Sequence, residues 1–347
     1  MVTAPRIVVA DDSPFMRTVL GGALSAAGFE VVGSARDGDE ALAQCHATRP
    51  DAMTLDLAMP GLDGLGVLRA LKEPGAPAVP VIVVSAFSPA HGARAVDALA
   101  EGAFDLVPKP AVGEPFHTFT ENLAERLRQA VAHGSAALLD RHAVNGHAVA
   151  APRSAGPGGG APRAVIIAAS TGGPRALAQL LPALPGRLGE GTLIVQHMPA
   201  GFTGSLAARL DRMSRLHVRE AALGDQLEPG TALVAPGGSH LRIDGTRHAR
   251  LTDEPAVGGL RPRADLTIAD VVDVWGERTL LVVLTGMGRD GAQGARAVRA
   301  AGGRVLCEAA ETCTVYGMPR AVVEDGLADL VLPLGELAEA IAAEAGA

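Results

Sequence analysis

Short apolar runs, largely of β-branched residues, alternate with helical patterns along most of this chain, and this alternation constrains the fold more than any other feature. The first series of apolar runs lies at residues 7–10, 52–55, 81–84 and 105–107. A second series lies at residues 164–168, 192–196, 231–235, 280–284 and 304–307. Apolar strands that alternate with helices form parallel sheets covered by those helices. The sequence therefore predicts an α/β protein with two doubly wound parallel-sheet domains.

The composition changes between the two series. Residues 119–131 show a last amphipathic helical pattern, and residues 156–162 then contain four glycines and two prolines. Such a segment is typical of a linker. We expect the chain to be divided into a first domain, a linker and a second domain at residues 1–131, 132–162 and 163–347.

Composition also makes several classes of protein less favoured. The formal net charge is −8 and no Lys/Arg run occurs, which disfavours a nucleic-acid partner. The N-terminus has no signal-peptide pattern, and no apolar run approaches the roughly 20 residues of a membrane span. We therefore expect a cytoplasmic protein without direct membrane insertion. The chain has too few cysteines for a disulfide framework, namely Cys45, Cys307 and Cys313.

Each predicted strand of the first domain is followed by polar or charged residues, which in chain order are Asp11 with Asp12, Asp56, Ser85 and Lys109. The carboxyl ends of parallel strands lie at one edge of a sheet, so we expect these side chains to converge. A single Asp at a strand end is more often a cap or turn residue. Several carboxylates together need a cation, and oxygen ligands suit Mg²⁺. A carboxylate can also accept a phosphoryl group, which Lys109 and Ser85 would contact.

Residues 5–125 resemble a response-regulator receiver domain, on the motifs Asp11-Asp12, DLAMPGLDG at 56–64, Ser85-Ala86 and Lys109-Pro110. The resemblance implies a flavodoxin-like fold, Asp56 as the phosphoacceptor and a histidine kinase as phosphodonor. It also implies a Mg²⁺ ion held by Asp11, Asp12, Asp56 and the carbonyl of Ala58. One position departs from the family, because receivers often carry an aromatic switch residue three positions before the lysine. That position is Leu106 here, and the nearby aromatic residue is Phe104.

The first predicted strand of the second domain runs into Ser170, within the sequence ASTGGP at 169–174. A hydroxyl at a strand-to-helix turn lies near the N–H donors of the helix, and glycines allow a tight turn. The pattern suits a serine nucleophile and equally an anion-binding loop. It does not match the G-x-S-x-G elbow of many serine hydrolases.

A nucleophilic serine needs a base, and His197 ends the next predicted strand. His240 is the competing base, although several loop residues separate it from its strand. A third group must orient the imidazole, and Asp290 lies on a glycine-rich loop after the strand at 280–284. We expect oxyanion contacts from the backbone N–H of Met287, with Thr171 as a supporting residue.

The glycine-rich loop at 286–291 also matches the dinucleotide pattern G-x-G-x-x-G, and Glu308 downstream would pass for a ribose-binding acid. A dinucleotide loop offers N–H donors to a pyrophosphate. Asp290 would place a negative charge in that cradle, which Arg289 offsets only in part. The local sequence therefore disfavours a dinucleotide site.

Residues 163–345 resemble the catalytic domain of chemotaxis protein-glutamate methylesterases, the CheB family, on motifs at 168–173, 196–202, 235–237, 284–291 and 316–320. The resemblance implies a Rossmann-like domain without a cofactor. It also implies Ser170 as nucleophile, His197 as base and Asp290 as orienting acid. The segment 256–265 departs from the family, because Arg263 stands where the family carries a serine.

The two resemblances imply a phosphorylation-activated hydrolase that demethylates glutamate methyl esters on methyl-accepting chemoreceptors in chemotaxis. They also imply deamidation of receptor glutamines by the same chemistry. The alternative is a response regulator whose second domain binds a nucleotide or another ligand without catalysis. That alternative would explain both glycine-rich loops and would not need His197 near Ser170.

Overall fold

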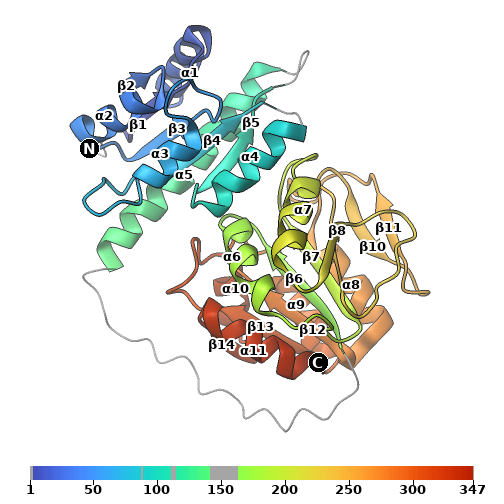
Figure 1. Cartoon of the computed structure of the whole chain (residues 1–347). Helices are drawn as coiled ribbons and strands as arrows, with labels where there is room; N and C mark the ends of the chain where they lie inside the picture. Colours follow the sequence, from blue (N-terminus) through green and yellow to red (C-terminus); the bar gives the residue numbers. More distant parts are fainter. Residues whose placement is uncertain (1–2, 87–88, 111–114, 141–162, 347) are drawn as a thin grey trace. The chain divides into compact units, whose positions relative to one another are not determined.

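The computed structural model describes residues 3–86, 89–110, 115–140 and 163–346. The chain divides into two compact units, residues 1–146 and 147–347 (Figure 1). Most of the expected linker, residues 141–162, lies outside the described residues. The helix before it continues to Asp140, past the domain end expected at 131.

Unit 1 is an open sheet of five parallel strands in the order β2-β1-β3-β4-β5. The strands are β1 (Arg6–Ala10), β2 (Glu30–Ala35), β3 (Ala52–Leu55), β4 (Val81–Ser85) and β5 (Asp105–Pro108). The helices are α1 (Pro14–Ala26), α2 (Gly38–Thr48), α3 (Gly64–Ala70), α4 (Pro89–Ala100) and α5 (Phe116–Asp140). This order is that of the flavodoxin-like fold, so the predicted fold class is confirmed. The strand β2 was not predicted, because it lies at the sheet edge and is mostly half-buried.

The first helix shows how local sequence sets an element and where periodicity misleads. Helix α1 is capped by Ser13, whose hydroxyl accepts the backbone N–H of Met16 at 3.4 Å. Leu24 is buried as expected, whereas Phe15 is 71% exposed. The apolar positions Phe15, Val19, Leu20 and Leu24 predict one buried helical face that includes Phe15, and for Phe15 this prediction is wrong. Phe15 precedes Leu24 by nine residues, or about two and a half helical turns, and so lies on the opposite side of the helix.

Unit 2 is built on seven parallel strands in the order β14-β13-β12-β6-β7-β9-β8. They are β6 (Ala164–Ala169), β7 (Gly191–Gln196), β8 (His217–Glu220), β9 (Thr231–Val234), β12 (Thr279–Val283), β13 (Arg304–Glu308) and β14 (Leu330–Leu332). The α-helices are α6 (Gly173–Leu180), α7 (Thr203–Met213), α8 (Ala264–Trp275), α9 (Ala292–Ala300), α10 (Met318–Glu324) and α11 (Leu334–Ala345). Short 3-10 turns follow α6 and α8, at Leu181–Ala183 and Gly276–Arg278. The five predicted strands and the parallel sheet are confirmed.

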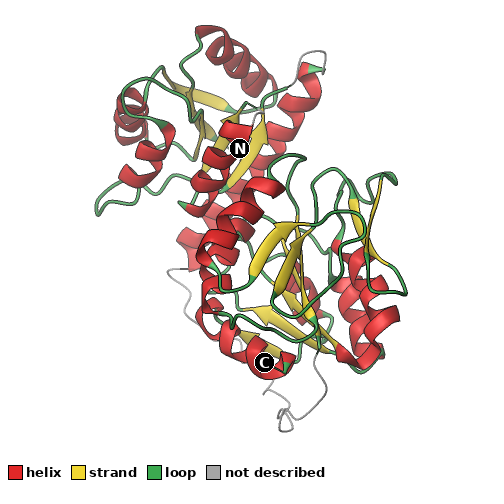
Figure 2. Cartoon of the chain, turned by 45° about the vertical axis from the view of Figure 1, so that its right-hand side comes forward, coloured by secondary structure: helices red, strands yellow, loops and turns green. Residues whose placement is uncertain are grey.

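Helices cover both faces of this sheet, as Figure 2 shows for unit 2. Helix α6 packs against α7 and α11, and α9 packs against α8 and α10. Strands β6, β7 and β12 are buried along their whole length. Among the described residues, no helix is both long and apolar enough to span a membrane.

An antiparallel hairpin of β10 (His240–Ile243) and β11 (Ala249–Thr252) was not predicted. Each strand has only four residues, and Arg242 pairs directly with Arg250 in its middle. The hairpin therefore lacks the apolar runs by which the sheet strands could be located in the sequence.

The order of the central strands defines where a site can form. Strand β6 lies between β7 and β12. The chain first fills the β7 side of the sheet and later returns on the β12 side. Ligand sites of open α/β sheets lie at such a reversal of direction, beyond the carboxyl ends of the strands. A functional site is therefore expected among the residues that follow β6, β7 and β12.

Candidate active site

Ser170 and His197 follow two neighbouring strands, β6 and β7. The backbone N–H of Ser170 donates to the Thr285 carbonyl at 3.0 Å, beyond the end of β12. The backbone N–H of His197 donates to the Ala169 carbonyl at 3.0 Å. The sheet thus continues far enough to fix both backbones, and the two predicted residues lie at one edge.

The turn after Ser170 depends on two glycines. Gly172 has φ +81°, and a Cβ there would lie 2.4 Å from the Thr314 side chain. A Cβ on Gly173 would lie 1.9 Å from Gln196 Oε1. The Gly173 N–H closes the turn by donating to the Ser170 carbonyl at 2.8 Å. Glycine is therefore required here both for backbone conformation and for space.

Gln196 is a supporting residue that the sequence analysis missed. Its buried side-chain Nε2 donates to the carbonyls of Ser170 and His197, each at 2.9 Å. One amide group therefore holds the backbones that carry the serine and the histidine. The available signal was a polar residue at the end of the otherwise apolar run at 192–196.

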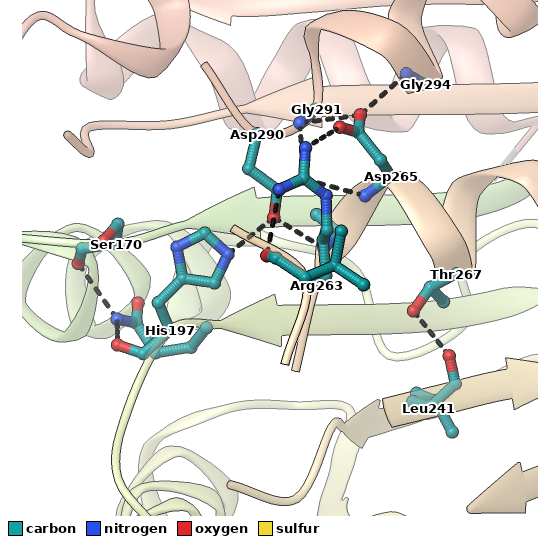
Figure 3. A network of polar contacts seen from close by, with 12 residues as sticks. Ser170, His197, Leu241, Arg263, Asp265, Thr267, Asp290, Gly291 and Gly294 are labelled. Carbon is teal, nitrogen blue, oxygen red and sulfur yellow. Dashed lines mark hydrogen bonds and ion pairs between the residues drawn. The ribbon is translucent and has the colours of Figure 1, made fainter. Parts of the chain in front are cut away.

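His197 and Asp290 form a buried pair. The His197 Nε2 lies 2.7 Å from Asp290 Oδ2, and both side chains are almost fully enclosed. Figure 3 shows the imidazole between Ser170 and Asp290, with its other nitrogen on the serine side. That nitrogen, Nδ1, has no hydrogen-bond partner among the described residues. The structure thus places the three predicted triad residues at one edge of the sheet, with Nδ1 on the side of the ring that faces Ser170.

The Asp290 carboxylate is held by three backbone donors besides the imidazole. The N–H groups of Ala264, Asp265 and Gly291 donate to it at 2.7, 3.0 and 3.0 Å. Burial by itself would raise the pKa of Asp290. The hydrogen bond and positive charge of His197, together with the backbone N–H groups, outweigh burial and hold that pKa well below its usual value. Asp290 is therefore a fixed carboxylate with its oxygens already oriented.

A second carboxylate and an arginine adjoin Asp290, and the sequence analysis did not place either in the site. Asp265 accepts N–H groups of Gly291 and Gly294 at 2.9 and 2.8 Å. Arg263 lies 2.8 Å from Asp265 and 3.5 Å from Asp290. Burial, and then the charge of Asp290, raise the pKa of Asp265. The available signal was the departure at Arg263, with an acid two residues later in the first turn of α8.

The loop after β12 lies directly against the serine. A Cβ on Gly286 would lie 2.8 Å from Ser170 Cβ, so only glycine permits this approach. The next residue is Met287, whose side chain is 41% exposed. Thr171 is buried, and its carbonyl accepts the Thr285 hydroxyl at 3.0 Å. Met287 and Thr171, the residues expected to support an oxyanion, thus directly follow Gly286 and Ser170, which lie against each other.

The competing base His240 and another acid of unit 2, Asp270, have different partners. His240 is buried at the start of β10, and its Nε2 lies 3.3 Å from the Pro255 carbonyl. Asp270 binds Arg242 through two hydrogen bonds of 2.6 and 2.8 Å. Neither side chain contacts Ser170 or His197 in the part of the chain that the structure describes.

The glycine-rich loop does not offer a phosphate cradle. At the start of α9, Asp265 occupies the Gly291 and Gly294 N–H groups. A pyrophosphate would need such donors. Glu308 is fully buried, and its carboxylate accepts the Thr285 N–H at 2.8 Å instead of facing a ligand. Burial raises the pKa of Glu308. These contacts argue against nucleotide binding here.

In unit 1, the predicted acidic residues converge at the carboxyl edge of the sheet. Oxygen atoms of Asp11, Asp12 and Asp56 lie within 4.8 Å of one another. The Lys109 ammonium lies 2.6 Å from Asp56 and 2.8 Å from Asp11. Burial would lower the pKa of Lys109, but its hydrogen bonds to both carboxylates and their charges raise it overall. An all-oxygen set of this kind fits a hard divalent cation such as Mg²⁺.

Two further predicted residues lie beside this cluster. Ser85 is buried at the end of β4, and its hydroxyl donates to the Ala86 carbonyl at 3.4 Å. The Ala58 N–H donates to the Asp56 carboxylate at 3.2 Å. The Ser85 contact is longer than an ordinary O–H···O hydrogen bond, whereas the Ala58 contact is at the long end of the ordinary N–H···O range.

The departure at the switch position has a structural counterpart. Leu106 is buried in β5. Phe104, just before that strand, is also buried, and its ring centroid lies 5.7 Å from that of His133 in α5. The aromatic residue of this region therefore packs against the last helix of unit 1.

Comparisons with known proteins cover both units. Residues 165–341 match the family model of CheB methylesterases, and residues 7–118 match that of response regulator receiver domains. A protein-glutamate methylesterase/protein-glutamine glutaminase of Symbiobacterium thermophilum is 43% identical over 98% of this chain and 97% of that protein. A protein of the same name from Thermotoga maritima is 38% identical over 96% of both chains. The crystal structure of the Thermotoga maritima CheB methylesterase catalytic domain covers 52% of this chain and 98% of that domain, with 41% identity and a TM-score of 0.51. The chain therefore belongs to the CheB methylesterase family and carries that family's receiver domain.

Proposed function

We propose that this protein removes methyl groups from glutamate methyl esters of chemoreceptors, and that unit 2 does so as a serine hydrolase. The observation that carries the proposal is the buried His197–Asp290 hydrogen bond, which leaves the second imidazole nitrogen for Ser170. The names of the full-length relatives, protein-glutamate methylesterase/protein-glutamine glutaminase, support the substrate class.

In the first half of the reaction, the Ser170 hydroxyl attacks the γ-carbonyl carbon of the ester. His197 accepts the hydroxyl proton on Nδ1, because Nε2 is engaged by Asp290. The imidazolium is stabilised by the Asp290 carboxylate. The tetrahedral adduct then collapses, the C–O bond to the methoxy group breaks, and methanol leaves with the proton from His197. The product is a glutamyl ester of Ser170.

In the second half, a water molecule attacks the glutamyl ester, and His197 accepts the proton of that water. Collapse of this adduct returns the proton to the Ser170 oxygen and releases the receptor with a free glutamate side-chain carboxylate. We assign stabilisation of both oxyanions to the Met287 backbone N–H, with Thr171 as the supporting residue. A preorganised N–H donor at that place lowers the energy of the charged adduct without reorganising solvent.

The same chemistry would deamidate selected receptor glutamines, with ammonia as the leaving group. An amide is a less reactive acyl donor than an ester. Protonation of its nitrogen by His197 is then the step on which departure of ammonia depends. The second half of the relatives' name supports this activity.

Unit 1 would receive a phosphoryl group on Asp56 from a histidine kinase. Asp11, Asp12, Asp56 and the Ala58 carbonyl would hold Mg²⁺, which when bound neutralises charge between the carboxylates and the phosphoryl group. The clustering of the three carboxylates supports this ligand set. Lys109 and Ser85 would bind the phosphoryl oxygens. We further propose that phosphorylation activates unit 2 and that the protein acts in the cytoplasm.

The direct test is release of labelled methanol from receptor-containing membranes whose glutamates carry labelled methyl esters. The full chain with Mg²⁺ and a small-molecule phosphodonor should release methanol above the rate of spontaneous hydrolysis. Receptor in which the methylated glutamates are replaced by alanine is the matched control substrate. No release beyond the spontaneous rate from esterified receptor would contradict the proposal.

A further inference from the structure

Arg263 contacts three parts of the active site at once. Its side chain is 21% exposed, and its Nη2 donates to Asp265 at 2.8 Å. Its Nε lies 3.5 Å from Asp290 Oδ1. Its Nη1 donates to the Val257 carbonyl at 3.1 Å. Figure 3 shows the guanidinium and the imidazole approaching the Asp290 carboxylate from different sides.

The two carboxylates in this group are coupled by their geometry. The Gly291 N–H is shared, lying 2.9 Å from Asp265 Oδ1 and 3.0 Å from Asp290 Oδ1. Buried carboxylates that share one donor repel each other unless a cation is present. Arg263 is that cation, because it pairs with both.

The other charged groups near the site are engaged elsewhere. Glu308, at the end of β13, accepts the Thr285 N–H inside the protein. Arg289, on the same loop as Asp290, is largely exposed and pairs with Asp325. The charge that reaches the imidazole from α8 and the loop before α9 is therefore that of Arg263, Asp265 and Asp290.

Arg263 also ties a surface turn to this group. Val257 and Leu260 exchange two backbone hydrogen bonds of 3.1 and 3.2 Å, which closes a tight turn through Gly258 and Gly259. A Cβ on Gly258 would lie 3.0 Å from the guanidinium. Both glycines have positive φ, at +61° and +78°. The turn thus lies directly on the arginine.

We propose that Arg263 and Asp265 form a positioning pair that holds Asp290 in place and sets the net charge that His197 meets. This inference rests on the proposed esterase function. Neither residue touches the reacting atoms, so both act through Asp290.

The pair makes opposite predictions for its two members. Arg263→Met removes a positive charge near the imidazole, so the protonated form of His197 is stabilised. The acid limb of the kcat/KM profile, where activity is lost as the pH falls, then moves to higher pH. In Asp265→Asn, Arg263 is left with one carboxylate, and the limb moves to lower pH. For a unit charge about 7 Å from the imidazole, an effective dielectric constant between 20 and 80 predicts shifts of about 0.4–1.7 pH units. Arg263→Lys keeps the charge, so its limb should stay near that of the wild type.

The experiment measures methanol release by the full chain from methylated receptor membranes between about pH 5.5 and 9, above the spontaneous rate. Arg242→Met is the matched control. Like Arg263, Arg242 pairs with a carboxylate of α8, but its partner is Asp270, to which it donates two hydrogen bonds. The His197 ring is also followed by NMR titration in each full-length variant, with its signal assigned by comparison with His197→Gln. This second readout decides the outcome where a variant is too slow to assay.

Opposite shifts in Arg263→Met and Asp265→Asn, without a shift in Arg242→Met, are the expected result. The inference would be overturned if neither the acid limb nor the His197 titration midpoint moved in either variant. It would also be overturned if Arg263→Met and Asp265→Asn shifted in the same direction. Arg263 and Asp265 would then have only a structural role. Failure of the proposed function is distinguishable, because the wild type would then show no release above the spontaneous rate at any pH.

Discussion

Among single residues, the chemistry depends on which imidazole nitrogen faces which partner. Nε2 of His197 is hydrogen-bonded to Asp290, and Asp290 is in turn held by backbone N–H groups. A carboxylate fixed in this way selects one tautomer and one ring orientation. We therefore expect the remaining nitrogen, Nδ1, to act as the base for Ser170.

Asp290→Asn tests this account of the imidazole. The amide keeps the shape of the carboxylate but loses the charge that stabilises imidazolium, and its NH₂ group favours the wrong tautomer. We expect kcat to fall by about a thousandfold or more with little change in KM. The measurement is the rate of methanol release at several receptor concentrations.

Asp270→Asn is the matched control for this variant, since Asp270 binds Arg242 away from Ser170. It should hydrolyse at close to the wild-type rate. If Asp290→Asn were active and Asp270→Asn or Asp265→Asn were inactive, the orienting acid would have been wrongly assigned.

The positions of the three expected triad residues could be predicted from the sequence better than those of their surroundings. Ser170, His197 and Asp290 each follow a strand that is visible as an apolar run, and parallel topology brings strand ends together. Arg263 and Asp265 could not be placed in the same way. They reach Asp290 because α8 begins beside the loop that precedes α9, and that packing leaves no periodic signal in the sequence.

At the scale of elements, the site consists of the three loops that follow β6, β7 and β12. Glycines allow these loops to approach one another closely. The β12–α9 loop approaches the serine at Gly286, where a Cβ would lie 2.4 Å from Met318 Sδ and 2.8 Å from Ser170 Cβ. The close approach is what brings the Met287 backbone toward the expected oxyanion. The β12–α9 loop and the turn after Ser170 therefore pack directly against each other.

Gly286→Ala should move the β12–α9 loop away from Ser170. The added methyl must push the loop from Ser170, and a displacement of about 1 Å costs roughly a hundredfold in rate. Gly245→Ala is the control, because a Cβ there meets nothing within 4 Å. Methanol release and thermal unfolding of both variants give the comparison. Unchanged hydrolysis by a folded Gly286→Ala protein would contradict the proposed loop geometry.

The elements themselves were predictable in proportion to their apolar burial. The fully buried central strands were all located, whereas the edge strand β8 and the hairpin β10–β11 were not. Strand β8 has the sequence HVRE, with a single buried apolar residue, so tertiary pairing and not composition makes it a strand.

At the scale of the whole molecule, an acidic phosphoacceptor domain and a hydrolase share one chain. The acidic cluster of Asp11, Asp12 and Asp56 lies in unit 1, and the expected triad lies in unit 2. We expect control of unit 2 by unit 1 to be a shift between active and inactive populations, with no rearrangement of the triad required.

We expect the unphosphorylated receiver to restrain the esterase. Removal of residues 1–150 should raise basal methanol release, because no receiver remains to stabilise the inactive population. A small-molecule phosphodonor with Mg²⁺ should activate the full chain and leave Asp56→Asn unchanged. The assay compares initial rates of the full chain, the shortened chain and Asp56→Asn on the same membranes.

A shortened chain that is folded yet no faster than the unphosphorylated full chain would rule out simple inhibition. Activation of Asp56→Asn by the phosphodonor would show that phosphorylation acts elsewhere. Either result would separate the receiver's role from the chemistry of unit 2.

The central claim is that Ser170 is the nucleophile, and the most direct measurement is methanol release by Ser170→Ala. The full-length variant should unfold at the wild-type temperature and lose at least about a thousandfold in rate, with only residual catalysis from binding and oxyanion contacts. Ser239→Ala is the control, because Ser239 is a loop serine whose hydroxyl donates a hydrogen bond to Asp253. It should release methanol at close to the wild-type rate. Near-wild-type methanol release from a folded Ser170→Ala protein would contradict the account.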